Sequence, residues 1–314
     1  MPQYYSYISG RGMFVPEKKM LNDELSQTLD TSDEWIRTRT GICARHLAAP
    51  TDTVADFGTK AASDALAEAN VEPGDVDMIV LATTSPDHVM PATATHIQHN
   101  LGAKRAFAFD VQAVCSGFVY ALAIADKFIK TGSANNVLVI GAEIMSRLLD
   151  WSDRSTCVLF GDGAGAVLVQ RREQPGILST RLYSNGEGYY MLYSDDSDAR
   201  FKRGKIVMNG RAVYSTAIEM MEASVRAELE RHGLSVDDVD WFVAHQANKR
   251  IIDSVAARLG LPAEKAVVTI ESFANTSAAT IPISLKLTNI KKGELVVLSS
   301  MGAGFTWGTA VLRW

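Results

Sequence analysis

The chain lacks the roughly 18 consecutive apolar residues that a membrane-spanning helix requires. Its first residues do not join a basic segment to an apolar one, as a secretory signal does. Three cysteines in 314 residues are too few for a disulfide-stapled fold. Positive charge is also not in excess, because 31 Lys and Arg face 36 Asp and Glu, and a general nucleic-acid binder needs a dominant positive surface. We therefore expect a cytoplasmic protein with free thiols, and neither a membrane nor a nucleic acid as partner.

What the chain does have is apolar material, since 47% of its residues are hydrophobic. Five short runs are almost continuously apolar and rich in β-branched residues, which is typical of strands covered on both faces. They are Val76–Ala82, Val137–Ala142, Ala164–Val169, Val239–Ala244 and Leu295–Ser299. Helical patterns such as Val54–Ala69 and Ala212–His232 lie between these runs. Alternating strands and helices predict an α/β protein with layered sheets.

Three segments recur in the same order, roughly 140 to 165 residues further along the chain. The pairs are Gly74–Ala82 with Asp237–His245, Phe128–Gly141 with Leu287–Ser299, and Gly163–Val169 with Phe305–Leu312. The alternative is that unrelated α/β strands simply resemble one another. We interpret the pattern as two duplicated α/β halves, residues 1–170 and residues 171–314. Sites in such folds form beyond the carboxyl ends of strands, so equivalent loops of the two halves should meet in one cleft.

The three cysteines differ in their surroundings. Cys43 lies in a polar segment, whereas Cys157 lies in an apolar run and is predicted to be a packing residue. Cys115 opens the apolar run Cys115–Lys130, which predicts a helix in the middle of the protein. The positive end of a helix dipole and its unpaired N–H groups favour the nucleophilic thiolate, although burial alone would raise the thiol pKa. Cys115 is therefore the candidate nucleophile of the first half.

The second half offers a histidine and an asparagine at equivalent places. His245 follows the predicted strand Val239–Ala244, and Asn275 begins a turn of small residues that leads into an apolar helix. A thiolate can attack a thioester or amide carbonyl. An imidazole can exchange a proton or donate to an oxyanion, and a carboxamide adds a second donor. These residues alone fit a cysteine hydrolase as well as an acyltransferase.

Two cofactor classes find little support in the sequence. His96 and His99 stand three residues apart in a predicted helix, but further metal ligands at suitable spacing are not evident, so no metal is predicted. The glycines of LFGDGAGAVL (Leu159–Leu168) run into a strand-like segment. A dinucleotide fingerprint should instead open a helix.

Eight motifs then follow one another along the chain. They are SDEWIRTRTGI (Ser32–Ile42), RHLAAP (Arg45–Pro50), ATTSPDHVMPATA (Ala82–Ala94), VCSGFVYAL (Val114–Leu122), LFGDGAGAVL (Leu159–Leu168), HQANKRII (His245–Ile252), NTSAATIP (Asn275–Pro282) and GAGFTWGTA (Gly302–Ala310). Together they resemble the β-ketoacyl–acyl-carrier-protein synthase III family, which are condensing enzymes of the thiolase superfamily. The resemblance extends over nearly the whole chain.

This resemblance implies a homodimer with the thiolase-like, five-layered αβαβα fold and no cofactor, since acyl-CoA is a substrate. Acyl-CoA would acylate Cys115. Malonyl–acyl carrier protein would then lose CO₂, with His245 and Asn275 stabilising the enolate, and give a β-ketoacyl–acyl carrier protein. An acyltransferase or ketosynthase of secondary metabolism with another acceptor, and a catalytically silent partner chain, remain alternatives. The starter acyl chain and the pathway stay open.

The resemblance also implies roles for residues around the trio. CoA would be held by Trp35, Arg39, Arg154 and Asn248. The carrier protein would dock on Gln246, Ala247, Asn248, Lys249 and Arg250, and Phe201–Lys205 would either extend this basic surface or form an ordinary solvated face.

The backbone N–H groups of Cys115 and Ala303 would form an oxyanion hole. Ala303 stands where the family often has glycine, so it would be strained if its φ were positive. Met301, at a position where the family often has phenylalanine, would line the acyl pocket together with Phe305. Met90 of each chain would close the pocket of its partner.

Overall fold

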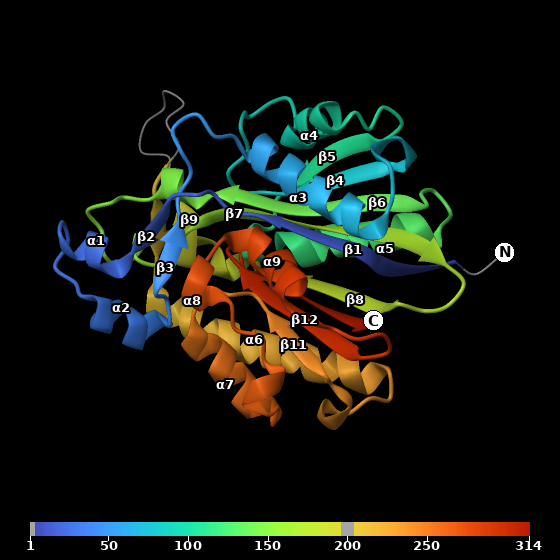
Figure 1. Cartoon of the computed structure of the whole chain (residues 1–314). Helices are drawn as coiled ribbons and strands as arrows, with labels where there is room; N and C mark the ends of the chain where they lie inside the picture. The colour runs from blue at the N-terminus through green and yellow to red at the C-terminus, as the bar shows by residue number, and fades with distance from the viewer. Residues whose placement is uncertain (1–3, 196–203) are drawn as a thin grey trace.

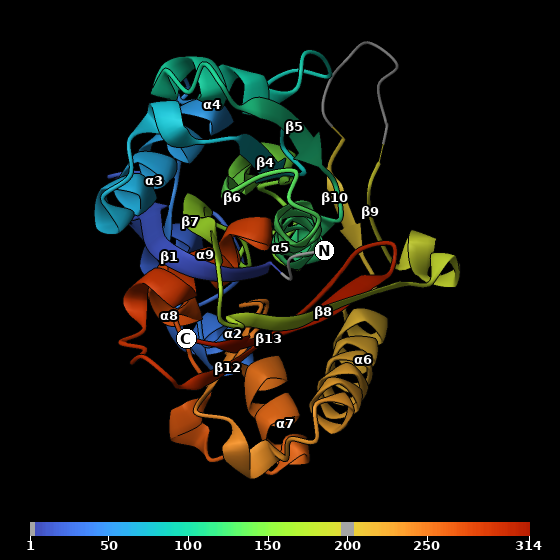
Figure 2. The ribbon, with the colours of Figure 1, turned by 90° about the vertical axis from the view of Figure 1, so that its right-hand side faces the viewer.

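The computed structural model describes residues 4–195 and 204–314, which form two β-sheets with helices between and outside them (Figures 1 and 2). The first sheet has the strand order β1 (Tyr5–Phe14), β7 (Asp162–Arg172), β6 (Asn136–Ile144), β4 (Met78–Ala82) and β5 (Phe107–Val111). The second has the order β8 (Ile177–Ser184), β13 (Thr306–Arg313), β12 (Leu295–Gly302) and β11 (Trp241–Ala244).

The two sheets repeat one pattern of strand directions. In each sheet, the first strand pairs antiparallel with the second and the second with the third, as in β1–β7–β6 and β8–β13–β12. The fourth strand then pairs parallel with the third, as in β6–β4 and β12–β11. Beyond β11, a single parallel bridge between Phe242 and Ala266 stands in the place of β5. The duplication predicted from the sequence is therefore confirmed in topology. The boundary at residue 170 stays a prediction, and β7 runs two residues past it.

The helices form three layers around these sheets. Helices α3 (Val54–Ala69) and α4 (Thr93–Leu101) cover the outer face of the first sheet, and α6 (Gly210–Arg231) and α7 (Lys249–Leu259) cover that of the second (Figure 1). Helices α5 (Gly117–Lys130) and α9 (Thr280–Leu287) lie between the sheets. This is the five-layered αβαβα arrangement that the resemblance implied.

Local sequence explains why these elements form where they do. Helix α3 has the bounds predicted from its pattern, because Thr53 caps its first turn by accepting from Asp56 N, and Asn70 ends it in the left-handed region at φ 53°. Helix α5 is apolar on nearly every side because both of its faces meet a sheet. All five residues of β4 are buried, as its uninterrupted apolar run predicts.

Smaller elements connect the layers. They are β2 (Lys19–Leu21), α1 (Asn22–Ser26), α2 (Asp33–Thr40), β3 (Ala44–His46), β9 (Leu192–Ser194), β10 (Ile206–Met208) and α8 (Ile270–Phe273). The N-terminal group packs against both halves, since Ile36 and Ile42 share a buried cluster with Leu148 and Ile270. In the described part of the chain, every helix is too short or too polar to cross a membrane.

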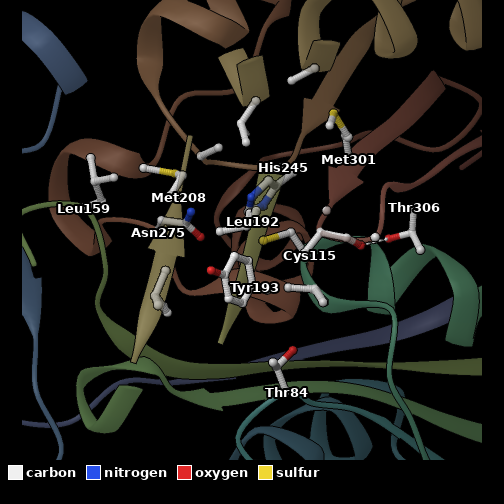
Figure 3. Close-up of a pocket in the computed structure, with 18 of the residues that line it drawn as sticks. Thr84, Cys115, Leu159, Leu192, Tyr193, Met208, His245, Asn275, Met301 and Thr306 are labelled. Carbon is white, nitrogen blue, oxygen red and sulfur yellow. Dashed lines mark hydrogen bonds between the residues drawn. The ribbon is translucent and has the colours of Figure 1, made fainter. Parts of the chain in front are cut away.

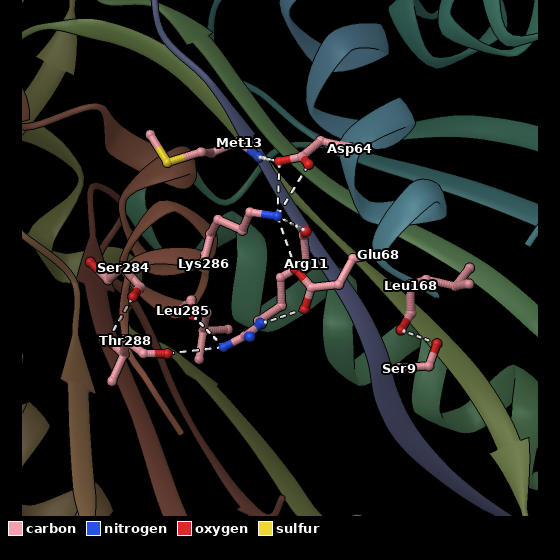
Figure 4. A network of polar contacts seen from close by, with 10 residues as sticks. All are labelled: Ser9, Arg11, Met13, Asp64, Glu68, Leu168, Ser284, Leu285, Lys286 and Thr288. Carbon is pink, nitrogen blue, oxygen red and sulfur yellow. Dashed lines mark hydrogen bonds and ion pairs between the residues drawn. The ribbon is translucent and has the colours of Figure 1, made fainter. Parts of the chain in front are cut away.

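One polar network joins the outer and central helix layers across β1 (Figure 4). Lys286 of α9 donates to Asp64 and Glu68 of α3, at 3.1 and 2.9 Å, and to the Arg11 carbonyl at 2.9 Å. The Arg11 guanidinium pairs with Glu68 at 2.9 Å and donates to the Thr288 carbonyl. Burial raises the pKa of Glu68, but hydrogen bonds from Lys286 and Arg11 outweigh burial and lower this pKa below its ordinary value.

We expect Lys286→Met to lower the free energy of unfolding at pH 7 by about 1 kcal/mol, because the pair is only partly shielded from water. A lowered carboxyl pKa gives stability that is present above the ordinary pKa of about 4.3 and is lost as the pH falls through the lowered one. Urea unfolding should thus show a smaller difference between variant and wild type at pH 3 than at pH 7. The control is Lys292→Met on the exposed turn before β12. An equal loss at both pH values would contradict this account.

Candidate active site

A cavity of about 620 Å³ takes residues from both halves into its wall. Cys115 of the first half and His245 and Asn275 of the second half all line it, and their side chains converge there (Figure 3). The three side chains are 6%, 3% and 6% exposed. The structure therefore brings the predicted trio together, as the duplication required.

Cys115 lies in a short 3₁₀ turn, Val114–Ser116, that runs directly into α5. The α-helix itself begins at Gly117, two residues later than predicted. Burial raises the pKa of the Cys115 thiol to about 12, with the Ser277 hydroxyl lowering it in part and the Glu143 carboxylate raising it. Burial therefore acts against the thiolate that the helix N-terminus is expected to favour.

The backbone is strained at matching places in the two halves. Val114 precedes Cys115 with φ 48°, and Ala274 precedes Asn275 with φ 56°. Ser277 adds a third positive φ, 51°, in the same region. Such conformations cost roughly 1–3 kcal/mol each for residues other than glycine and persist only where the surroundings enforce them. The strained backbone before Cys115 and Asn275 therefore lowers the stability of the fold while it orients these two side chains.

His245 follows β11 directly, and its backbone N–H donates to the Ser299 carbonyl at 2.8 Å. Burial lowers the pKa of its imidazole to about 3, so the ring is neutral at physiological pH. Nδ1 lies 2.7 Å from Thr280 Oγ1. The ring nitrogen left for a ligand is therefore Nε2.

Asn275 is fixed at both its backbone and its side chain. Its N–H donates to the Leu159 carbonyl at 3.0 Å, and its carbonyl accepts from Gly161 N at 3.1 Å. Its Oδ1 accepts from Ser277 N at 2.8 Å. With the carboxamide oxygen occupied, the NH₂ group is the part that can serve a ligand, and it is a donor.

The end of β12 and the turn after it pack against Cys115. A Cβ on Gly302 would lie 2.8 Å from Cys115 N, so only glycine fits there. Thr306 Oγ1 lies 3.0 Å from the Ala113 carbonyl and 3.1 Å from the Ala303 carbonyl. The positive φ of this turn falls on Gly304, at 129°, and not on Ala303. The strain considered for Ala303 is therefore absent.

The residues predicted to hold CoA lie together, and one of them, Asn248, lines the cavity. The guanidinium carbons of Arg39 and Arg154 lie 5.9 and 5.2 Å from the ring centre of Trp35. Asn248 lines the cavity and donates from Nδ2 to the Arg39 carbonyl at 3.0 Å. A planar aromatic ring beside two cations suits a nucleotide base with phosphates, and the assignment to CoA stays a prediction.

Gln246 does not belong to a docking surface. It is 1% exposed, and its amide donates to the Ala244 and Val267 carbonyls at 2.8 and 3.1 Å. Its Oε1 accepts from the backbone N–H groups of Thr269 and Ile270. Gln246 instead fixes the loop after β11, and the prediction that it contacts the carrier protein is wrong.

The other predicted docking residues have mixed surroundings. Ala247 and Asn248 line the cavity. Lys249 pairs with Asp253 at 2.8 Å, and Arg250 is exposed with its guanidinium 5.5 Å from the Tyr214 ring centre. Of the segment 201–205, residues 201–203 lie outside the described part of the chain, and Lys205 is exposed. Arg250 is thus the most available cation among those predicted.

Comparison with known proteins fits this arrangement. Two family models match, 3-oxoacyl-[acyl-carrier-protein (ACP)] synthase III over residues 109–186 and its C-terminal part over residues 229–314. The β-ketoacyl-[acyl-carrier-protein] synthase III of Ehrlichia canis (strain Jake) is 51% identical, over 98% of this chain and 99% of that protein. The chain belongs to the 3-oxoacyl-[acyl-carrier-protein] synthase III family.

Solved structures agree in fold with this synthase III assignment. The 3-oxoacyl-[acyl-carrier-protein] synthase III of Aquifex aeolicus VF5 matches with a TM-score of 0.94 and 47% identity, over 98% of this chain and 100% of that chain. The priming β-ketosynthase of the R1128 polyketide pathway matches with a TM-score of 0.95 and 34% identity, over 99% and 96% of the two chains.

The acyl-pocket residues predicted from the synthase III resemblance fare differently. Met301 lines the cavity. Phe305 does not, because it is 7% exposed in the core of the second half, where its ring lies against Gly188. That prediction is wrong. Met90 is 83% exposed at the surface, and its place in a partner's pocket stays a prediction.

Several buried polar residues near this synthase III site were not predicted from the sequence. Glu143, near the C-terminal end of β6, accepts from the backbone N–H groups of Thr84 and Ser85 and from the Ser85 hydroxyl. Burial raises the pKa of Glu143. Thr280 follows Asn275 inside the motif NTSAATIP, but the sequence alone gives no sign that it reaches His245. Over residues 4–195 and 204–314, no group of three or more His, Cys, Asp or Glu could hold a metal ion.

We expect alkylation of Cys115 by iodoacetamide to accelerate about tenfold per pH unit from pH 7 to pH 9.5, because only the thiolate reacts and a pKa near 12 keeps its fraction rising throughout. Mass spectrometry of the Cys115 peptide measures the rate, and Cys115→Ala removes the signal. A plateau below pH 8 would show that the free thiol has a lowered pKa.

Proposed function

We propose that the protein is the condensing enzyme that initiates fatty-acid synthesis. An acyl-CoA acylates Cys115, and a decarboxylative Claisen condensation with malonyl–acyl carrier protein gives β-ketoacyl–acyl carrier protein, CoA and CO₂. The observation that carries this proposal is the meeting of one thiol, one imidazole and one carboxamide in one cavity of a synthase III chain.

In the first half-reaction, Cys115 Sγ attacks the thioester carbonyl of acyl-CoA. The backbone N–H groups of Cys115 and Ala303 stabilise the oxyanion as the carbon–sulfur bond to CoA breaks. The CoA thiolate leaves with the proton that Cys115 gives up. The thiol must ionise in a buried site, so its deprotonation belongs to the attack on bound substrate and not to the resting protein.

In the second half-reaction, the bond between the malonyl carboxylate and the α-carbon breaks, and CO₂ leaves. The negative charge moves to the thioester oxygen, where His245 Nε2–H and the Asn275 NH₂ donate to it. The resulting carbanion attacks the acyl-cysteine, a carbon–carbon bond forms, and the cysteine sulfur leaves. Cys115 then regains a proton from solvent.

The proposal includes no cofactor, because CoA arrives as part of a substrate. Trp35, Arg39 and Arg154 would hold its adenine and phosphates, since two guanidinium groups already face the indole ring. The acidic carrier protein would dock on the cations at the start of α7, Lys249 and Arg250. We also propose that the protein is located in the cytoplasm, as expected from the sequence.

A homodimer is part of the same proposal. Strand β5 ends the first sheet, and in the described residues its outer edge pairs with no other strand. Phe107 on this strand is 44% exposed, and Val89 and Met90 in the loop after β4 are 95% and 83% exposed. A free edge with exposed apolar side chains favours association with a second copy.

We expect Cys115→Ala to abolish acylation by acyl-CoA, because no nucleophile remains. His245→Ala and Asn275→Ala should still be acylated but release CO₂ from malonyl–acyl carrier protein about 10²- to 10³-fold more slowly, the usual cost of losing one donor to a developing oxyanion. Intact-mass measurement and ¹⁴CO₂ release follow the two steps. Equal loss of both steps in all three variants would contradict the assigned roles.

The same assays decide between two acceptors. The structural match to a priming β-ketosynthase of a polyketide pathway makes a specialised acyltransferase or ketosynthase the second candidate. A wild-type protein that is acylated but never consumes malonyl–acyl carrier protein would favour that candidate. A panel of acyl-CoA starters identifies the preferred chain in either case.

We expect Arg250→Glu to raise the KM for malonyl–acyl carrier protein about tenfold or more while leaving the KM for acyl-CoA within about twofold. The reason is that the substitution places a negative charge where the acidic carrier protein would dock. Lys292→Glu makes the same charge change on an exposed turn before β12 and should alter neither KM. Equal increases in both KM values would remove the docking assignment.

A further inference from the structure

The hydroxyl of Thr280 stands between the catalytic imidazole and a backbone carbonyl. Its Oγ1 lies 2.7 Å from His245 Nδ1 and 3.1 Å from the Ser277 carbonyl oxygen. Thr280 is 2% exposed and His245 is 3% exposed. Since water has little access, these protein atoms must satisfy one another.

A threonine hydroxyl has one hydrogen to donate, so only two arrangements are open. In the first, Thr280 donates to His245 Nδ1, and the neutral ring carries its hydrogen on Nε2. In the second, Thr280 donates to the Ser277 carbonyl, accepts from Nδ1–H, and leaves a lone pair on Nε2. The choice decides whether His245 presents a donor or an acceptor to the cavity.

Two observations favour the first arrangement. The Ser277 carbonyl already accepts the Thr280 backbone N–H, so it does not need the hydroxyl hydrogen. The contact with Nδ1 is also the shorter of the two, at 2.7 against 3.1 Å. A neutral ring with one hydrogen then has that hydrogen on the nitrogen that faces the cavity.

We propose that Thr280 is a positioning residue that donates to Nδ1 of His245 and thereby holds the hydrogen of the imidazole on Nε2. The position of this hydrogen does not depend on the proposed function, but its role in the reaction rests on that function. His245 then donates to the enolate oxygen, and it cannot accept the Cys115 proton at Nε2. The histidine is a hydrogen-bond donor and not the base that activates the thiol.

The proton position can be measured without any substrate. In ¹⁵N-histidine-labelled wild-type protein at pH 7, we expect the His245 signals to show an Nε2 that carries hydrogen and an Nδ1 that does not. His245→Gln identifies these signals among those of the six histidines. A hydrogen on Nδ1 would overturn the proposal, whatever the protein catalyses.

Variants test what the hydroxyl does for the reaction. We expect Thr280→Val to slow CO₂ release from malonyl–acyl carrier protein about 10- to 100-fold, by analogy with the cost of losing the hydrogen-bond partner that orients a metal-bound histidine. Acylation of Cys115 should change less than about threefold. Thr280→Ser keeps the hydroxyl and should restore CO₂ release. Equal slowing of both steps, or no slowing in a folded Thr280→Val, would overturn the proposal.

Thr288→Val is the matched control, because it removes another buried threonine hydroxyl of the α9 segment whose hydrogen goes to the Ser284 carbonyl. It should slow neither step. If Thr280→Val fails to fold, the ¹⁵N measurement on wild-type protein still decides the proposal. If wild-type protein neither becomes acylated nor releases CO₂ while Nε2 carries the hydrogen, the proposed function fails and the assignment of the proton stands.

Discussion

Burial governs the chemistry of this site. The three reactive side chains are nearly excluded from water between two sheets, and burial pushes the cysteine pKa up to about 12 and the histidine pKa down to about 3. Both shifts favour the uncharged form. The resting site is therefore a neutral thiol, a neutral imidazole and a carboxamide. Negative charge arises only once substrate is bound, where fixed donors in a site of low polarity stabilise it most.

Much of the fold and the identity of the three site residues could be predicted from local sequence patterns. The apolar run Val76–Ala82 predicts a buried strand, and the structure has one at Met78–Ala82. Helix α3 has its predicted bounds because its capping residues, Thr53 and Asn70, adjoin the periodic segment in sequence. Cys115 and His245 could be found because each follows a strand-like run, and Asn275 because it begins a turn of small residues before an apolar helix. The internal repeat relates the positions of Cys115 and Asn275.

The rest depends on contacts between residues far apart in the chain. Gln246 adjoins the catalytic histidine in sequence, but the backbone at Val267 and Thr269 draws its side chain inward. Phe305 stands beside cavity residues, yet its ring turns into the core against Gly188. The thiol pKa could not be predicted either, because it depends on how two distant halves close over Cys115. No local pattern reports such distances.

The duplication also explains how the site residues are distributed between the two halves. Equivalent turns, each introduced by a residue of positive φ, carry a nucleophile in one half and a donor in the other. The histidine, His245, directly follows the end of strand β11 in the second half. A charged imidazole would stabilise an enolate strongly but would also hold the malonyl carboxylate that has to leave. Neutral donors strengthen their hold only as charge moves onto the thioester oxygen, so their stabilisation goes to the transition state and not to the bound substrate.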